Sequence, residues 1–148
     1  MSAKGTRTFL LDTNVFVAAV KDPRRETATL RLLLDVLTRD DVELVGNDLW
    51  VEEMVRYAEE FRSETASWLV GALVGKARLV SVDANFRAIC RRYVTTPDPA
   101  DVLHAATCLQ ERAILVTNDR HFGRIRREGI VAVWTISEAI RALSVPGG

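Results

Sequence analysis

The sequence is poor in cysteine, in lysine and in long apolar runs, and each shortage excludes a class of protein. Its 148 residues include only two cysteines, Cys90 and Cys108, too few for a disulfide scaffold. Neither has a histidine or second cysteine at metal-ligand spacing, so both are expected to be reduced thiols in or near the core. No stretch reaches the roughly 18 apolar residues of a membrane span, because Asp12 and Asn14 interrupt the most hydrophobic segment, residues 9–20.

A signal peptide is lacking too, because residues 1–9 contain no apolar core. Together with the reduced thiols, this predicts a cytoplasmic protein without a membrane association. The net charge is zero, from 20 basic and 20 acidic residues. Only three of the bases are lysine, and arginine suits phosphate better than lysine does. The arginine excess gives limited support to a nucleic-acid partner, since a dedicated duplex-binding domain is usually basic overall.

Short apolar runs alternate with segments of helical periodicity, and no repeat or linker interrupts them before the end of the chain. We therefore expect one domain over residues 1–144 and a frayed tail at 145–148. The expected strands are residues 8–12, 42–45, 78–82, 114–117 and 131–135. The expected helices are residues 14–20, 26–38, 48–62, 64–76, 84–94, 99–112, 121–128 and 137–143. This order predicts an α/β fold, a three-layer α/β/α sandwich around a central, mostly parallel sheet.

Two acids follow predicted strands directly. Asp12 comes after the first strand, and Asp119 comes two residues after the apolar run 114–117. In open parallel sheets ligands bind beyond the carboxyl ends of the strands, which makes both acids candidate site residues. A helix is expected after each of them, so a structural role as helix N-cap remains an alternative for both.

A third acid is singled out by helical geometry. At 100° per residue along 48–62, the apolar face holds Trp50, Met54 and Tyr57, and Glu53 lies at its margin. Glu52 points nearly opposite and is explained as a surface residue. A half-buried carboxylate needs a partner or a cation, so Glu53 is either a structural residue with a partner or a ligand.

The segment 96–106 contributes two more acids. Asp98 followed by Pro99 is a common helix start, which favours a structural cap for this acid. Asp101 is expected beside the apolar stripe of the same helix, and two alanines there would let the helix pack closely on the sheet. His104 is expected to point to the other side, in a surface or supporting role.

If these acids meet at one rim of the sheet, their mutual repulsion destabilises it unless a divalent cation is bound. The candidate residues are Asp12, Glu53, Asp101 and Asp119. Oxygen ligands select hard ions, here Mg²⁺ or Mn²⁺, which also bridge to substrate phosphates. Four arginines follow the last acid and suggest phosphodiester chemistry, although a solvated helix face is the favoured explanation for them. They are Arg120, Arg124, Arg126 and Arg127.

Four segments in order along the chain together resemble the PIN-domain family, in particular the VapC-type ribonuclease toxins of prokaryotic toxin–antitoxin systems. They are LLDTNVF at 10–16, the helix that carries Glu53, DPADVLHAA at 98–106 and LVTNDRHF at 115–122. The resemblance implies a metal-dependent endoribonuclease that hydrolyses RNA phosphodiester bonds with a metal-activated water, leaving a 5′ phosphate and a 3′ hydroxyl. It implies the metal ligands and catalytic residues Asp12, Glu53, Asp101 and Asp119, the auxiliary metal-binding acid Asp98, and the supporting residues Asn14 and Thr117.

One departure from the family pattern concerns His121. It stands where many relatives have an acid, which puts the second metal site in question and makes a phosphate contact by His121 an alternative. The resemblance also implies a cognate antitoxin and a homodimer. Residues 48–76 are a candidate surface for either, although core packing explains their apolar residues equally. Those residues are Trp68, Leu69, Leu73 and Val74.

Three other classes of protein share some of these features. Receiver domains and haloacid-dehalogenase-type phosphatases also have acids at strand ends, but both need a lysine near the last catalytic strand, and Lys4, Lys21 and Lys76 all precede the 114–117 strand. A PIN-like module that binds RNA or a protein without cutting is the alternative to the nuclease. The complete set of acids argues against it, because a module without a metal has no reason to gather carboxylates.

Overall fold

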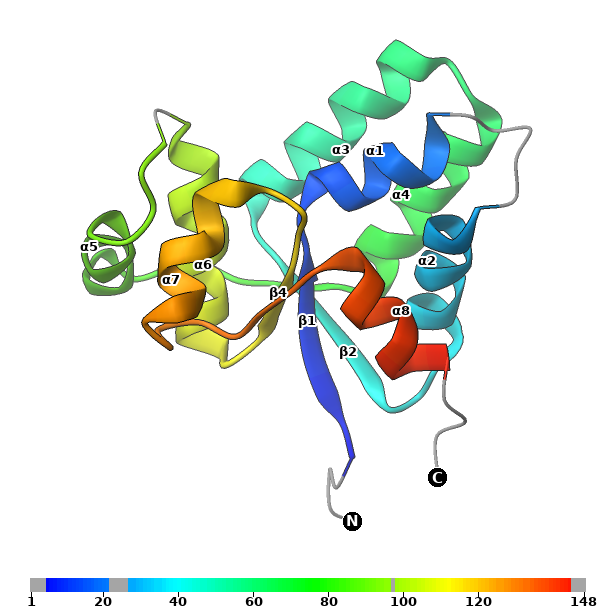
Figure 1. The fold of residues 1–148 in the computed structure, drawn as a ribbon. Coiled ribbons are helices and arrows are strands. Elements are labelled where there is room, and N and C mark those ends of the chain that lie inside the picture. The colour runs from blue at the N-terminus through cyan, green and yellow to red at the C-terminus, as the bar shows by residue number, and fades with distance from the viewer. Residues whose placement is uncertain (1–4, 22–26, 97, 145–148) are drawn as a thin grey trace.

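The centre of the fold is a five-stranded parallel sheet (Figure 1), seen in a computed structural model that describes residues 5–21, 27–96 and 98–144. The strands are β1 (Arg7–Leu11), β2 (Val42–Gly46), β3 (Arg78–Leu79), β4 (Ile114–Val116) and β5 (Val133–Trp134). Their order is β3-β2-β1-β4-β5, and every neighbouring pair is parallel. The strand order reverses between β1 and β4, which is where open α/β sheets bind their ligands.

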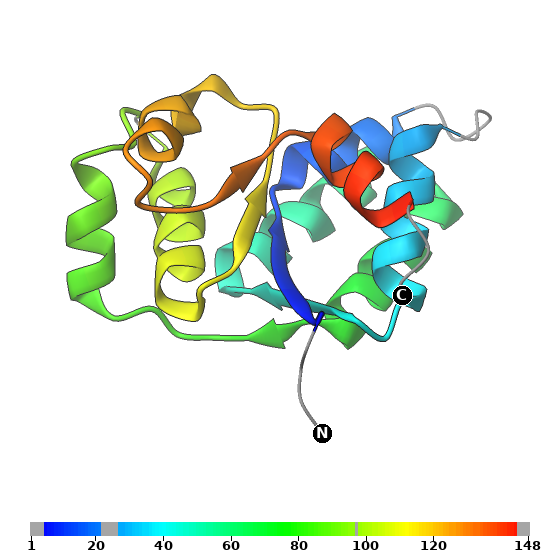
Figure 2. The same cartoon turned by 60° about the horizontal axis from the view of Figure 1, so that its bottom comes forward.

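Helices cover both faces of this sheet, which confirms the predicted sandwich. Figures 1 and 2 show α5, α6 and α7 on one face and α1, α2, α4 and α8 on the other, with α3 running out beside α1. The helices are α1 (Thr13–Val20), α2 (Ala28–Thr38), α3 (Asp48–Phe61), α4 (Glu64–Lys76), α5 (Ala84–Arg91), α6 (Pro99–Glu111), α7 (Gly123–Arg127) and α8 (Ile136–Ser144). A short 3₁₀ helix, η1 (Arg120–Phe122), precedes α7.

The central strands are buried on both faces, as their continuous apolar sequence predicts. Phe9, Leu10 and Leu115 have no exposed side-chain surface. Cys90 and Cys108 are buried free thiols, which confirms their predicted place in the core. Across the described part of the chain, no helix has the length and apolar character that crossing a membrane requires.

Two predicted strands are shorter than expected by three residues each, and both lie at an edge of the sheet. The strand predicted at 78–82 is reduced to β3, and the one predicted at 131–135 is reduced to β5. An edge strand pairs with one neighbour only, so it ends where that neighbour ends. Here β2 stops at Gly46 before α3 begins, and β4 is only three residues long.

The helix predictions hold best where a cap marks the start. The helix at 64–76 is confirmed at both ends, and the Ser63 hydroxyl caps it by accepting from the Ala66 N–H. The helix predicted at 84–94 ends at Arg91, because several following N–H groups turn back to the Cys90 carbonyl. The predicted helix 121–128 begins instead as the 3₁₀ turn η1. Residue 26, predicted to be helical, and the predicted tail 145–148 lie outside the described residues.

A buried tryptophan fastens α3 to the carboxyl end of β1. The Trp50 Nε1–H donates to the Leu11 carbonyl oxygen at 2.7 Å. Gly46 makes room for the indole, because a Cβ at that position would overlap the Trp50 ring. The next turn of α3 carries Glu53, and Asp12 directly follows Leu11. The bond between Trp50 and Leu11 therefore holds Glu53 beside Asp12.

Candidate functional site

A cavity of about 330 Å³ lies at the carboxyl ends of β1 and β4, and the structure brings all the predicted acids to its wall. Its acidic lining residues are Asp12, Glu53, Asp98, Asp101 and Asp119. They come from the β1–α1 junction, α3, the start of α6 and the loop after β4. The cavity therefore sits where the strand order reverses, the place that the sheet topology favours for a ligand.

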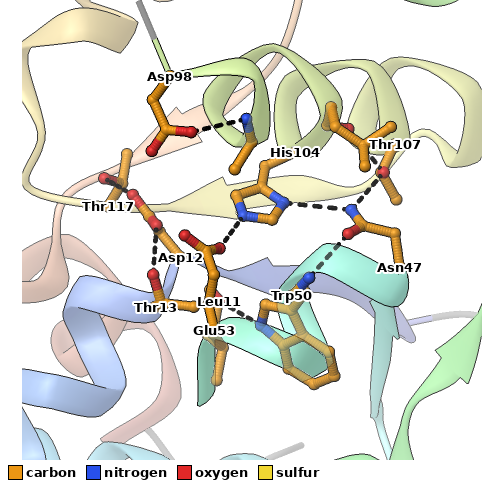
Figure 3. Close-up of polar contacts among 12 residues, drawn as sticks. Leu11, Asp12, Thr13, Asn47, Trp50, Glu53, Asp98, His104, Thr107 and Thr117 are labelled. Carbon is orange, nitrogen blue, oxygen red and sulfur yellow. Dashed lines mark hydrogen bonds and ion pairs between the residues drawn. The ribbon is translucent and has the colours of Figure 1, made fainter. Parts of the chain in front are cut away.

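Asp12 occupies the N-cap position of α1, but its side chain makes no capping hydrogen bond. Its Oδ2 accepts a hydrogen bond from the Thr117 hydroxyl at 2.8 Å instead (Figure 3). The structural alternative of a side-chain cap is therefore wrong for this acid. Burial raises the pKa of Asp12, and the charges of Glu53 and Asp119 raise it further, against the lowering effects of Thr117 and His104.

Thr117 and Asn14, predicted to support the acids, form one hydrogen-bonded unit behind Asp12. Besides donating to Asp12, the Thr117 hydroxyl accepts from Asn14 Nδ2 at 3.2 Å and from the Asp119 N–H at 3.0 Å. Its hydrogen-bonding capacity is thus used completely. The Asn14 Oδ1 atom is buried without a hydrogen-bond partner in the described part of the chain, although Asn14 lines the cavity. A bound cation or its water would satisfy that acceptor.

The predicted placement of two neighbouring glutamates is confirmed. Glu53 is half-buried and lines the cavity, whereas Glu52 is exposed. Trp50 and Met54, on the face used to set the helical phase, are buried. The carboxylate of Glu53 accepts a hydrogen bond from His104 at 2.8 Å.

Asp101 lies in the first turn of α6 and is only 9% exposed. Burial raises its pKa to about 6, with a further contribution from the charge of Asp12. An acid with a pKa of about 6 is partly protonated near neutral pH, because burial and the neighbouring carboxylates disfavour its charged form. The close packing predicted for α6 is confirmed by Ala105 and Ala106, which are fully buried.

Asp98 and Asp119 line the cavity and also cap helices. The Asp98 carboxylate accepts from the Ala100 N–H at 2.9 Å, and that of Asp119 accepts from the His121 N–H at 2.9 Å. The structural alternative is therefore correct for both, but it does not remove them from the cavity wall. His121 Nδ1 lies 3.0 Å from Asp119 Oδ1 and 3.6 Å from Asp101 Oδ2. Asp101, Asp119 and His121 thus offer three ligand atoms within 4.8 Å of one another.

The placement predicted for His104 was wrong in one respect. Its side chain is not on the surface but only 1% exposed, and it lies between Glu53 and Asn47. Sequence reasoning missed Asn47 and Thr107 altogether, although both are buried polar residues of this network. The only available signal was Asn47 as an N-cap before α3, a local feature that does not reveal partners on α6.

The arginines near the last acid are partly engaged within the protein. Arg126 forms an ion pair with Glu138 at 2.9 Å. The Arg124 guanidinium lies 5.4 Å from the Tyr93 ring centre and donates to the Arg92 carbonyl. For these two, the alternative of an ordinary surface role has direct support.

The candidate partner surface on α3 and α4 is less apolar than predicted. Trp68 is 60% exposed, but Leu69 and Leu73 are buried in the core and Val74 is half-buried. Most of the apolar residues of α4 therefore serve core packing. Trp68 is the residue of that set that remains available to a partner.

The residues around the cavity fit a divalent cation. Several carboxylates face one space, two of them have raised pKa values, and a buried amide oxygen on the same wall lacks a partner. A cation would offset the repulsion and the loss of hydration that raise these pKa values. Carboxylate and amide oxygens are the donors that hard cations prefer.

Comparisons with known proteins agree with this geometry. The model of the PIN domain family matches residues 9–128. A search of curated proteins gives no significant sequence match. The fold is shared by a chain from VapBC2 of Rickettsia felis, a structure bound to a DNA fragment from its promoter, with a TM-score of 0.60 and 17% identity. It is also shared by a chain from VapBC-1 of nontypeable Haemophilus influenzae, with a TM-score of 0.59 and 16% identity. These alignments cover 86% and 88% of this chain and 98% of each of those chains.

A chain of FitAcB from Neisseria gonorrhoeae is similar as well, with a TM-score of 0.58 and 22% identity over 87% of this chain and 98% of that one. At these identities the structural matches show a shared fold. The family match spans most of the chain and includes every acid at the cavity. The chain therefore belongs to the PIN-domain family.

Proposed function

We propose that this PIN-domain protein is a divalent-metal-dependent endoribonuclease. The observation that carries the proposal is the gathering of five carboxylates around one cavity, with the pKa values of Asp12 and Asp101 raised. A protein gains no stability from such an arrangement, since each acid disfavours the ionised form of the next. Perturbed acids in a cleft are instead typical of functional sites.

In this proposal Asp12, Glu53, Asp101 and Asp119 hold Mg²⁺ or Mn²⁺, and Asp98 is an auxiliary acid. Such a cation, when bound, supplies an activated water and offsets negative charge on the scissile phosphate. The chain's own residues orient the ligands. Thr117 holds Asp12 and the backbone of Asp119 through its hydroxyl. The His121 ring lies near enough to Asp101 to add a nitrogen ligand or contact a phosphate, and a nitrogen ligand favours Mn²⁺ over Mg²⁺.

RNA is the proposed substrate, with a 5′ phosphate and a 3′ hydroxyl on the products. Its support is the family membership together with the hard-cation ligand set, which suits phosphodiester hydrolysis. Arg120 directly follows Asp119 and is exposed, so it is positioned to contact a phosphate next to the scissile one.

We further propose that the protein is the toxin of a type II toxin–antitoxin system, acting in the cytoplasm as one nuclease domain over residues 1–144. The support is the similarity to chains from VapBC and FitAcB structures. A cognate antitoxin and a second copy of the chain are the proposed partners. The exposed apolar residues of α3 and α4, Val55, Phe61 and Trp68, are the candidate contact surface.

The test is an RNA cleavage assay on the purified protein. Single-stranded RNA should be cut with Mg²⁺ or Mn²⁺, cleavage should stop when EDTA is added, and excess Mg²⁺ should restore it. Asp12→Asn is the control for a contaminating nuclease. Cleavage that persists under EDTA contradicts the metal mechanism, whereas RNA binding without cleavage under every metal condition supports the non-catalytic module instead.

A further inference from the structure

A buried chain of hydrogen bonds leads from the start of α3 to the Glu53 carboxylate (Figure 3). The Trp50 backbone N–H donates to Asn47 Oδ1 at 2.9 Å. Asn47 Nδ2 lies 3.0 Å from Thr107 Oγ1 and 3.1 Å from His104 Nδ1. His104 Nε2 lies 2.8 Å from Glu53 Oε1. Asn47, His104 and Thr107 are at most 2% exposed, so the hydrogen bonds among them are shielded from water.

Two backbone groups set the direction of every hydrogen bond in this chain. The Trp50 N–H can only donate, so the oxygen of the Asn47 amide must face it and the amide nitrogen must face the other way. The Thr107 hydroxyl donates its one proton to the Leu103 carbonyl at 2.8 Å. It therefore accepts from Asn47 Nδ2, and the second amide proton is directed at His104 Nδ1.

The same logic settles which nitrogen of His104 carries the proton. Nδ1 faces a donor and must accept, so the ring proton is on Nε2. That proton is donated to Glu53 Oε1. One oxygen of Glu53 is thereby held, and Figure 3 shows the other directed toward Asp12.

We infer that His104 is a positioning residue, which holds the Glu53 carboxylate turned toward Asp12 so that its second oxygen is presented to a divalent cation. The inference rests on the proposed function, since it concerns a ligand of that cation. A buried histidine that merely fills space would not need a hydrogen-bond chain with a fixed direction that ends on a carboxylate at the cavity wall. Partners of this kind orient metal ligands in many proteins, and losing one costs about 10- to 100-fold in metal affinity.

The tautomer can be tested in the unmodified protein. Nitrogen-15 NMR of the imidazoles at pH 7 is simple to assign, because the chain has only two histidines and His121→Gln removes the other signal. The expected result is a protonated Nε2 and an unprotonated Nδ1 on His104. A proton on Nδ1 overturns the inference, because that nitrogen could then not accept from Asn47.

Two substitutions separate the two hydrogen bonds of the ring. His104→Gln places an amide nitrogen near the position of Nε2 and keeps a donor for Glu53. His104→Asn places an amide oxygen near the position of Nδ1, which keeps the acceptor for Asn47 and loses the donor to Glu53. The measurement is Mn²⁺ binding without RNA by electron paramagnetic resonance. The Mn²⁺ affinity of His104→Asn is expected to be at least about 10-fold weaker than that of wild type, and that of His104→Gln is expected to stay within about 3-fold of wild type.

A purely structural role predicts a different pattern. It predicts that Mn²⁺ affinity follows the thermal stability of the variants and that His104→Asn and His104→Gln bind Mn²⁺ alike. That result would overturn this inference but not the proposed function. Wild-type protein that binds no Mn²⁺ would overturn the proposed function and this inference together. In a Glu53→Gln background the difference between His104→Asn and His104→Gln should disappear, and a difference that persists there would show that His104 does not act through Glu53. If either variant fails to fold, the NMR measurement still decides.

Discussion

Carboxylates meet opposite environments in two regions of the molecule. In the first turn of α8, Glu138 accepts from the Thr135 N–H and pairs with Arg126, and these contacts lower its pKa to about 2. At the cavity, Asp101 is buried near Asp12, and its pKa is raised to about 6. The first acid is most stable ionised, whereas the second is partly protonated at neutral pH.

The contrast extends beyond these two acids. The pKa values of Asp41 and Glu111 are lowered by hydrogen bonds from Arg39 and Arg78, respectively. An acid with an arginine partner contributes to the fold by itself, but an acid held among other acids lowers the stability of the fold until a cation is bound. The comparison thus distinguishes acids that stabilise the fold from acids kept for a ligand.

The largest effect is expected for Asp12→Asn. The amide still accepts from Thr117 but cannot supply the charge that a cation needs, so RNA cleavage should fall at least about a thousandfold, or about 4 kcal/mol. Without metal, the free energy of unfolding in urea should stay equal or rise, because one repelling charge is gone. A variant that unfolds would show that Asp12 belongs with the stabilising acids.

A somewhat smaller effect should separate two adjacent glutamates. Glu53→Gln should reduce cleavage at least about a hundredfold, or about 3 kcal/mol, since it removes a half-buried ligand charge. Glu52→Gln, on the exposed side of α3, should stay within about threefold of wild type and serves as the matched control. The assay is RNA cleavage at saturating Mg²⁺. A dead Glu52→Gln beside an active Glu53→Gln would mean that the wrong glutamate has been assigned to the cavity.

The pH dependence of the free energy of unfolding should show that the pKa of Asp101 is raised. The pKa of Asp101 is raised from 3.8 to about 6 in the folded protein. The contribution of Asp101 to the free energy of unfolding is therefore complete below pH 3.8 and is lost as the pH rises through 6. The metal-free protein should therefore lose on the order of 2 kcal/mol from this group between pH 4 and 7. The measurement is urea unfolding at several pH values, and Asp101→Asn should flatten this part of the curve. A wild-type curve parallel to that of the variant would contradict the raised pKa.

The smallest effect is expected for Glu138→Gln. The lowered pKa of Glu138 stabilises the fold above about pH 4.5, and this contribution is lost as the pH falls through about 2. The variant should have a slightly lower Tm than wild type at pH 7, and the difference should vanish near pH 2. Thermal unfolding followed by circular dichroism measures both. RNA cleavage should be unchanged, and a loss of cleavage would place Glu138 among the functional acids.

Local features of the chain were sufficient to predict much of the fold and the membership of the cavity. Helical periodicity placed Glu53 and not Glu52 at the cavity, because both positions are set by one helix. The pattern of an apolar strand followed by an acid predicted that Asp12 and Asp119 lie at the cavity, because the carboxyl ends of parallel strands share an edge of the sheet. The edge strands β3 and β5 were overestimated, because their length depends on neighbours from other parts of the chain.

The role of each acid could not be decided in this way. Asp12, Asp98 and Asp119 all have the sequence of an N-cap, yet Asp12 alone of the three makes no side-chain capping bond. What separates Asp12 from the others is Thr117, which follows β4 and lies 105 positions away in sequence. Local sequence describes which bond an acid can make, but its actual partner depends on which strands are neighbours.

His104 shows the limit most clearly. Its place on α6 was evident from the spacing of the apolar residues, because that spacing repeats within a few residues. Its partners were not, because Glu53 and Asn47 lie 51 and 57 positions earlier in the chain, on and next to α3. Only the packing of α3 and α6 at the carboxyl edge of the sheet brings these groups together, and the cost of leaving a buried polar group without a partner then sets the direction of every hydrogen bond between them.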